Sequence, residues 1–173
     1  GDKIAGYLQR EGLTPKAILL THGHFDHVMG IPPLKEKYDL PVYIHRLEED
    51  VLESPQLNAC AMIGANVSLK ADHLIEDGEE LSIAGARIRV LFTPGHTKGG
   101  VSYYIEDLNA VICGDTLFEG SVGRTDLPTG SMGTLVRSIR EKLFVLDDEV
   151  SVLPGHGGAT TIGWEKKYNP FVS

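Results

Sequence analysis

The sequence lacks three features that would each indicate a specialised class of protein. Its apolar stretches are short, and none reaches the ~20 consecutive apolar residues of a membrane-spanning helix. It has only two cysteines, too few for a disulfide scaffold, so we expect a reducing, cytoplasmic location. Basic residues are also scarce, with 16 Lys and Arg against 24 Asp and Glu and a formal net charge of −8. We therefore expect neither nucleic acid nor a membrane as a partner.

The composition is otherwise that of a folded globular protein. Apolar residues make up 42% of the 173 positions and charged residues 23%, so the chain has enough apolar material to bury a core. No internal repeat, low-complexity tract or linker interrupts it. We predict a single domain that spans residues 1–173, with an oligomeric state that the composition does not define.

Short apolar runs separated by Gly, Pro and Asp predict a mixture of strands and helices. Strands are predicted at residues 17–20, 41–45, 81–83, 88–92, 101–105, 110–113 and 150–153, and helices at 2–11, 28–37 and 134–144. These elements do not alternate strictly, so a doubly wound parallel sheet is not expected. The order favours an α+β fold in which helices form layers around packed sheets.

Residues that can bind metals follow directly after four of the predicted strands. They begin with a histidine-rich segment after Leu20 and continue with His96, Asp115 and His156 after three later strands. Strand ends on a rigid sheet can hold ligands that come from distant parts of a chain. This placement predicts a metal site that is assembled from four segments.

The histidine-rich segment, residues 21–27, is the most specific of the four. It reads Thr-His-Gly-His-Phe-Asp-His and has four ligand-type side chains in six residues: His22, His24, Asp26 and His27. His22 and His24 stand two apart at a strand end, so both can point to the same side. Imidazole and carboxylate groups are common ligands of zinc and iron. Together with the three downstream residues, they make seven candidate ligands.

The same residues are the basis of a family resemblance. The segment His22-Gly23-His24-Phe25-Asp26-His27, with His96, Asp115 and His156 downstream in that order, resembles the metallo-β-lactamase fold superfamily over essentially the whole chain. The resemblance implies a four-layered αββα sandwich with metal ions in a cleft at one edge of the two sheets. Such proteins usually have a pair of strands before the point where this sequence starts. We therefore expect this chain to lack those first N-terminal strands.

The resemblance also implies how the ligands are divided between two metal ions. His22, His24 and His96 would bind the first ion, Asp26, His27 and His156 the second, and Asp115 would bridge both. Two divalent ions ~3.5–4 Å apart can share a water, lower its pKa and polarise a carbonyl oxygen. Asp26 would also orient the resulting hydroxide, so Asp26 and Asp115 are the predicted catalytic residues. Zinc is the predicted metal, with iron or manganese as alternatives.

Two positions separate this sequence from the antibiotic-hydrolysing members of the superfamily. Sequences that resemble those enzymes have a thiolate ligand at the position of Asp115 and commonly an arginine at the position of His27. Residues 114–118 and 123–126 and the tail 154–171 instead resemble the glyoxalase II group, in particular its small single-domain bacterial members. That resemblance implies a hydrolase for small-molecule thioesters such as hydroxyacylglutathione. We expect this chain to lack the helical domain that binds glutathione in larger members, which leaves the thiol carrier open.

Other activities of the same fold are alternatives. Persulfide dioxygenases share residues 123–126 and an Asn-Pro tail, and they bind a single iron through positions that match His22, His96 and Asp115. They tend to have alanine where Gly155 stands, which favours a hydrolase. A nucleic-acid phosphodiesterase would need a basic face, and the acidic composition argues against one. A lactonase is a further alternative, and a non-catalytic binding module is disfavoured by the complete ligand set.

Arg124 is the candidate substrate-binding residue. It lies in the loop after Asp115, the predicted bridging ligand, and its guanidinium offers a fixed positive charge to an anionic substrate. The alternative interpretation is an ion pair with Asp126 that shapes the loop. Thr21 and Thr97 are expected to place hydroxyls beside the ligands or in turns.

The remaining prominent residues receive structural interpretations. We expect Cys60 and Cys113 to be buried thiols and Trp164 to anchor the C-terminal segment by packing. The acidic runs 48–50 and 147–149 are expected at the solvated surface. Two further histidines lack neighbouring ligand types and are interpreted as surface or capping residues: His45 and His73.

Overall fold

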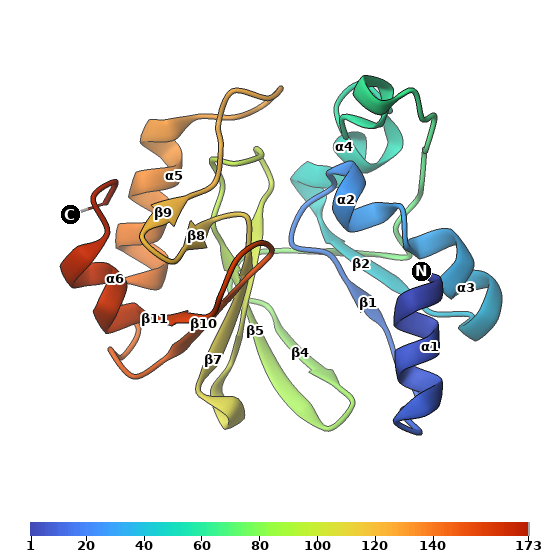
Figure 1. Ribbon diagram of the computed structural model, residues 1–173, viewed down its shortest axis with the longest axis horizontal. Coiled ribbons are helices and arrows are strands. Elements are labelled where there is room, and N and C mark those ends of the chain that lie inside the picture. The colour runs from blue at the N-terminus through green and yellow to red at the C-terminus, as the bar shows by residue number, and fades with distance from the viewer. Residues whose placement is uncertain (173) are drawn as a thin grey trace. The chain divides into compact units, whose positions relative to one another are not determined.

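The computed structural model describes residues 1–172, which fall into two compact units that divide after Leu74. Each unit has its own sheet and helices (Figure 1). The boundary lies within the strand β3 (His73–Ile75). Among residues 1–172, every helix is too short or too polar to cross a membrane. The prediction of a single domain over residues 1–173 stays a prediction.

The first unit is built on a three-stranded sheet in the order β1-β2-β3, in which β1 (Ile18–Leu19) runs parallel to β2 (Val42–His45). Its helices are α1 (Asp2–Arg10), α2 (Phe25–Val28), α3 (Ile31–Tyr38) and α4 (Glu49–Glu53), with 3-10 turns at Arg46–Glu48 and Cys60–Ile63. Side chains from the sheet and from α2, α3 and α4 form its core, which contains Leu20, Val28, Ile31, Val42, Ile44 and Leu52.

Two consecutive prolines begin α3 without disrupting it. Pro32 and Pro33 lie in its first turn, where backbone N–H groups have no partner within the helix and the fixed φ of proline suits a helix start. The helix ends at Asp39, whose φ of 48° is left-handed. The predicted helix at 28–37 is therefore confirmed as α3, with the single-turn α2 just before it.

The second unit is built on a six-stranded sheet in the order β11-β10-β7-β6-β5-β4. The strands are β4 (Glu80–Ile83), β5 (Ala86–Phe92), β6 (Val101–Ile105), β7 (Ala110–Gly114), β10 (Ser151–Pro154) and β11 (Thr160–Thr161). β5 and β7 each pair antiparallel with β6, and β10 pairs parallel with β7. β5, β7 and β10 therefore run in the same direction and end at the same edge of the sheet.

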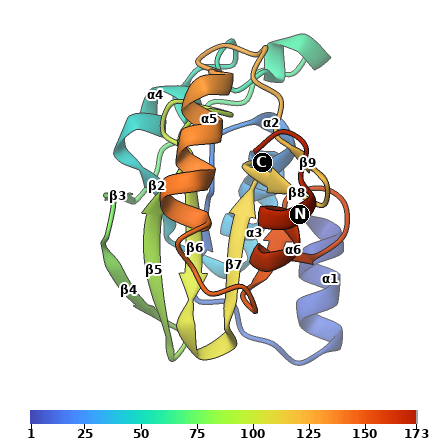
Figure 2. The ribbon, with the colours of Figure 1, turned by 90° about the vertical axis from the view of Figure 1, so that its left-hand side faces the viewer.

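Helices cover one face of this sheet (Figure 2). α5 (Met132–Ser138) continues into a π-helical turn (Ile139–Leu143), and α6 (Ile162–Tyr168) follows β11. Their apolar side chains pack with those of β5, β7 and β10 in a core that includes Leu91, Val111, Cys113, Leu135, Ile139, Leu143, Val152 and Ile162. A 3-10 turn at Glu106–Leu108 links β6 to β7, and a small hairpin of β8 (Leu117–Phe118) and β9 (Ser121–Val122) completes the unit.

The predicted strands and helices are confirmed within three residues at each end. The prediction missed short elements, namely α2, α4, α6, β3, β11, the 3-10 turns and the β8–β9 hairpin. α6 begins at an N-cap, where the Thr161 hydroxyl accepts a hydrogen bond from the Trp164 N–H. Such short elements depend on caps and on tertiary contacts, so they leave little periodic apolar pattern to detect.

A buried carboxylate on α6 anchors the C-terminal segment. Glu165 is fully buried and accepts hydrogen bonds from the Gly120 N–H at 3.1 Å, the Thr160 hydroxyl at 2.7 Å and the Asn169 amide at 2.7 Å. It thereby ties α6 to β11 and to the β8–β9 hairpin. Trp164, the anchor expected from the sequence, keeps 41% of its surface exposed. The anchoring group is its polar neighbour, because three donors converge on that carboxylate.

We predict that Glu165→Ala lowers the free energy of unfolding by about 3 kcal/mol, because it leaves buried donors without their acceptor. Chemical denaturation followed by circular dichroism would measure the change. Glu149→Ala, at an exposed position, is the matched control and should stay within about 0.5 kcal/mol of the parent protein. Equal stabilities of the two variants would contradict the anchoring role.

Both cysteines are free and fully buried, as the sequence predicted. The Cys113 Sγ lies 3.2 Å from the Leu117 carbonyl oxygen, to which it donates. Burial is the main cause that raises the pKa of this thiol, to about 12. The thiol is therefore neutral at physiological pH and is a poor nucleophile.

Because both thiols are inaccessible and Cys113 is neutral, we predict that neither cysteine reacts with a disulfide reagent in the folded protein at pH 8. Two equivalents per chain should react after unfolding in guanidinium. The absorbance of the released thiolate measures both values, and the Cys60→Ala variant assigns any signal to one cysteine. Rapid reaction of one equivalent in the native protein would show that a thiol is accessible.

Candidate metal centre

The segment between β1 and α2 carries the candidate ligands of the first unit. His22 and His24 are almost fully buried, with 2% and 3% of their surfaces exposed. His24 is the extended N-cap residue of α2, and Asp26 and His27 lie in the single turn of that helix. Extended backbone followed at once by a helical turn brings the four side chains together. The ring centroid of His22 lies 4.9 Å from that of His24 and 4.1 Å from that of His27.

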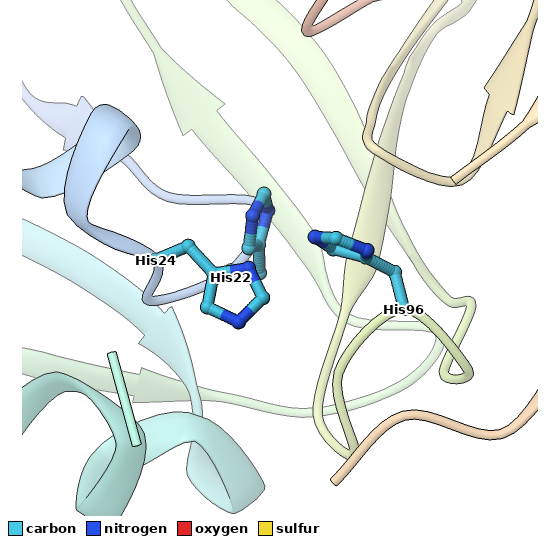
Figure 3. Close-up of side chains that lie close together, drawn as sticks. All are labelled: His22, His24 and His96. Carbon is cyan, nitrogen blue, oxygen red and sulfur yellow. The ribbon is translucent and has the colours of Figure 1, made fainter. Parts of the chain in front are cut away.

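The ends of β5, β7 and β10 carry the candidate ligands of the second unit. His96 follows β5, Asp115 follows β7 and His156 follows β10. One carboxylate oxygen of Asp115, Oδ2, lies 3.7 Å from His96 Nε2 and 3.5 Å from His156 Nε2. Figure 3 shows His96 on its loop, and His22 and His24 on the segment that follows β1.

These separations fit ligands of a common ion better than direct hydrogen bonds. A hydrogen bond from an imidazole to a carboxylate is shorter, at about 2.7–2.9 Å. Two atoms that each lie ~2.1 Å from one tetrahedral ion are roughly 3.4 Å apart. The Asp26 and His27 pair has a similar separation, with 3.9 Å between Oδ2 and Nε2. The geometry within each unit therefore fits metal binding.

The orientation of His96 is set by a backbone carbonyl. Its Nδ1 lies 2.7 Å from the carbonyl oxygen of Arg124. A carbonyl only accepts hydrogen bonds, so Nδ1 carries the hydrogen and Nε2 presents its lone pair in the neutral ring. This is the tautomer that binds a metal through Nε2, and a hydrogen bond of this kind is typical of metal-ligating histidines.

Two glycines allow the backbone to approach these ligands closely. A Cβ at Gly95, whose φ is +136°, would lie 2.3 Å from the Leu135 backbone. A Cβ at Gly123 would lie 1.8 Å from the Asp115 carbonyl oxygen and 3.3 Å from His96 Nδ1. The loops that carry His96 and Asp115 can therefore adopt these paths only because both positions lack a side chain.

The side chain of Arg124 is engaged in an ion pair. Its Nε and Nη2 donate to the two carboxylate oxygens of Asp126 at 2.7 and 2.8 Å. The same hydrogen bonds lower the pKa of Asp126 to about 2 and raise that of Arg124. The structure thus contains the ion pair that the sequence offered as an alternative. Substrate binding by Arg124 stays a prediction.

The other polar residues near the ligands mostly have the expected places. The Thr21 hydroxyl lies 3.2 Å from His22 Nδ1. Thr97 is buried and shapes a turn through its carbonyl, which accepts from the Gly95 N–H at 2.8 Å. His45 caps a 3-10 turn by accepting from the Leu47 N–H. His73 differs from His45 in role, since it is exposed and stacks on Tyr43.

One buried carboxylate beside the histidine-rich segment was missed. Glu48 belongs to the acidic run 48–50, which was predicted to be solvated. Glu49 and Asp50 are exposed, but Glu48 is fully buried and accepts a hydrogen bond from the Gly23 N–H at 2.8 Å. The only sequence signal was its position shortly after the apolar strand β2. The candidate ligands likewise follow shortly after apolar strands. The second acidic run, 147–149, is exposed as predicted.

The donor set has a chemistry that suits a metal centre. Five imidazoles and two carboxylates are offered, namely His22, His24, His27, His96, His156, Asp26 and Asp115. Nitrogen and oxygen donors of this kind suit zinc, iron and manganese. Cys113 does not belong to this set, and its thiol donates to the Leu117 carbonyl oxygen at 3.2 Å. These residues therefore fit divalent metal ions.

The chain matches the family model of the metallo-beta-lactamase superfamily over residues 2–156. Two curated relatives match nearly all of it. “Probable metallo-hydrolase YqgX” of Bacillus subtilis (strain 168) is 49% identical over 175 residues, with 100% of this chain and 83% of that protein covered. Hydroxyacylglutathione hydrolase GloC of Haemophilus influenzae (strain ATCC 51907 / DSM 11121 / KW20 / Rd) is 34% identical, with 99% and 82% covered.

Solved structures agree with the family match. The BLEG-1 B3 metallo-beta-lactamase is 40% identical with a TM-score of 0.95, covering 99% of this chain and 84% of its own. TTHA1623 in a di-iron-bound form is 42% identical with a TM-score of 0.87, covering 98% and 84%. ETHE1 from Myxococcus xanthus is 30% identical with a TM-score of 0.77, covering 98% and 68%.

These matches confirm the fold predicted from the sequence, a mixture of sheets and helices of the metallo-β-lactamase type. They also support the general class of metal-binding hydrolase, since the family model and the relatives agree on it. The family model includes all seven candidate ligands in its matched range. The chain therefore belongs to the metallo-beta-lactamase superfamily.

Proposed function

We propose that the protein is a dinuclear metal-dependent hydrolase that cleaves small-molecule thioesters of the hydroxyacylglutathione type. The observation that carries the proposal is the position of Asp115, with one carboxylate oxygen 3.7 and 3.5 Å from the Nε2 atoms of His96 and His156. A carboxylate that lies between two imidazoles is suitably placed to act as a ligand of two ions. The 34% identity with GloC supports the substrate class.

The family resemblance divides the candidate ligands into two sets. One set is His22, His24 and His96, and the other is Asp26, His27 and His156, with Asp115 common to both. We propose that each set holds one ion and that Asp115 binds both. The di-iron-bound form of TTHA1623, a protein 42% identical to this chain, supports two metals. It makes iron a candidate beside zinc and manganese.

The bound ions would supply a water of lowered pKa and would stabilise negative charge on the thioester carbonyl oxygen. The chain itself would supply orientation and proton transfer. Asp26, with 34% of its side chain exposed, is proposed to accept the proton of the attacking water and to hand it to the leaving thiolate. The His96–Arg124 hydrogen bond would keep His96 in the tautomer that binds metal.

Substrate recognition is proposed to involve Arg124. Its side chain is 60% exposed and pairs with the exposed Asp126, so an anionic group of a substrate can compete for the guanidinium. An exposed ion pair is weak enough to be exchanged in this way. The net charge of −8 supports a small molecule rather than nucleic acid as the substrate.

Two alternative activities have specific support. An iron persulfide dioxygenase that would use His22, His96 and Asp115 is supported by the resemblance of residues 123–126 to that group. The BLEG-1 structure, described as a B3 metallo-beta-lactamase, is 40% identical and supports β-lactam hydrolysis. The dioxygenase would hold one iron on three of the seven candidate ligands, and β-lactam hydrolysis would break an amide bond instead of a thioester bond.

Metal analysis and three assays on one preparation separate these activities. We predict two metal ions per chain in protein purified without added metal, cleavage of a hydroxyacylglutathione, and no oxygen uptake with glutathione persulfide. Elemental analysis, thioester absorbance and an oxygen electrode measure these values. One iron per chain with oxygen uptake would replace the proposal by the dioxygenase. Faster turnover of a β-lactam than of any thioester would replace it by the lactamase.

We predict that Asp115→Ala loses metal at both positions and lowers kcat/KM for the thioester at least about 100-fold, because one side chain serves both ions. Elemental analysis of the folded variant, with circular dichroism as the folding check, measures the loss. Asp107→Ala removes an exposed carboxylate of the same unit and is the control. A variant at position 115 that keeps two metals and full activity would overturn the bridging role.

A further inference from the structure

The backbone between the first two histidines of the metal segment is held by a buried carboxylate. Glu48 is 0% exposed, and its Oε2 accepts a hydrogen bond from the Gly23 N–H at 2.8 Å. Gly23 stands directly between His22 and His24 in the sequence. Burying a carboxylate costs desolvation free energy, so a buried carboxylate requires hydrogen-bond donors. For Glu48, one of these donors is the backbone N–H between two candidate ligands.

The same part of the chain also packs tightly against Gly23. A Cβ built at this glycine would lie 3.0 Å from Val51 Cγ1, 3.2 Å from the Leu52 nitrogen and 3.4 Å from Glu48 Oε2. Glu48 is the N-cap residue of α4, and Val51 and Leu52 lie in that helix. The start of α4 is therefore a rigid surface against which the His22–His24 backbone rests.

A second hydrogen bond holds the backbone of Phe25, the residue directly after His24. The Phe25 N–H donates to the carbonyl oxygen of Asn58 at 2.8 Å. Asn58 is fully buried, and its side chain donates to the Val67 carbonyl and accepts from the Cys60 N–H. The N–H groups on both sides of His24 are thus fixed by buried residues.

We infer that Glu48 is a positioning residue: its carboxylate holds the Gly23 N–H and thereby sets the directions of His22 and His24 toward a metal ion. This inference rests on the proposed function in that these histidines bind metal. Metal ligands must keep their distances within about 0.2 Å, so a support that fixes the backbone between two of them affects affinity. The reach of the side chain, and not its charge, is what this role requires.

Two substitutions separate reach from charge. Glu48→Gln keeps the length of the side chain and an oxygen acceptor but removes the charge. Glu48→Asp keeps the charge but shortens the side chain by one methylene, so that its oxygen falls short of the Gly23 N–H. Glu49→Gln, at the exposed neighbouring position, is the matched control.

The measurement is the affinity of the folded metal-free protein for Co²⁺ and Zn²⁺, by competition with a chelator, together with the visible absorption of bound Co²⁺. We expect about 10–100-fold weaker binding and an altered Co²⁺ spectrum for Glu48→Asp, as for other residues that orient metal ligands. Glu48→Gln and Glu49→Gln should bind within about threefold of the parent, because the neutral acceptor retains the hydrogen bond.

A parent-like affinity and spectrum for folded Glu48→Asp would overturn the inference, as would a folded Glu48→Gln variant that binds as weakly as Glu48→Asp. Thermal unfolding in chelator distinguishes a purely structural role, which would lower the stability of the metal-free variants and leave metal affinity unchanged. If Glu48→Asp does not fold, Glu48→Ala, which also removes the acceptor of the Gly23 N–H, takes its place: weakened metal binding supports the inference and parent-like binding overturns it. Metal affinity is measured without substrate. Failure of thioester cleavage would therefore contradict the proposed function but not the positioning role of Glu48.

Discussion

The shared direction of β5, β7 and β10 is the constraint on which the second unit's part of the metal centre depends. Each strand ends at the same edge of the sheet, since β5 and β7 both pair antiparallel with β6 and β10 pairs parallel with β7. The pairing of Pro154 with Gly114 then places Asp115 and His156 just beyond neighbouring strand ends. Backbone hydrogen bonds that are remote from any metal thus determine which side chains can share one.

The ligands of both units are oriented largely through the main chain. The Arg124 carbonyl selects the tautomer of His96, and Gly123 lets that loop approach Asp115. In the first unit the Glu48 carboxylate holds the Gly23 N–H between two histidines. Main-chain groups have few torsional freedoms, so a hydrogen bond to the backbone beside a ligand restricts the direction of that ligand.

Sequence patterns were sufficient where the relevant physics is local. Alternation and helical periodicity located the strands and long helices, and clustering identified the ligand types. Prediction was wrong for Glu48 and did not identify the buried Glu165, because the burial of both depends on a distant partner. Glu48 stands in an acidic run but meets Gly23, 25 residues away, and Glu165 meets Gly120, 45 residues away. A run of carboxylates has no local property that distinguishes the buried member from its solvated neighbours.

The sequence by itself determined where the longer strands and helices lie along the chain, which seven residues are candidate ligands, and which family their spacing resembles. Only the tertiary structure decided that Asp115 lies within 3.7 Å of two imidazoles from other strand ends, that Arg124 pairs with Asp126, and that Glu48 is buried beside Gly23. The physical reason is that strand register and helix packing join segments far apart in the chain. Those long-range contacts, rather than residue type, set the distances between charged groups and their burial.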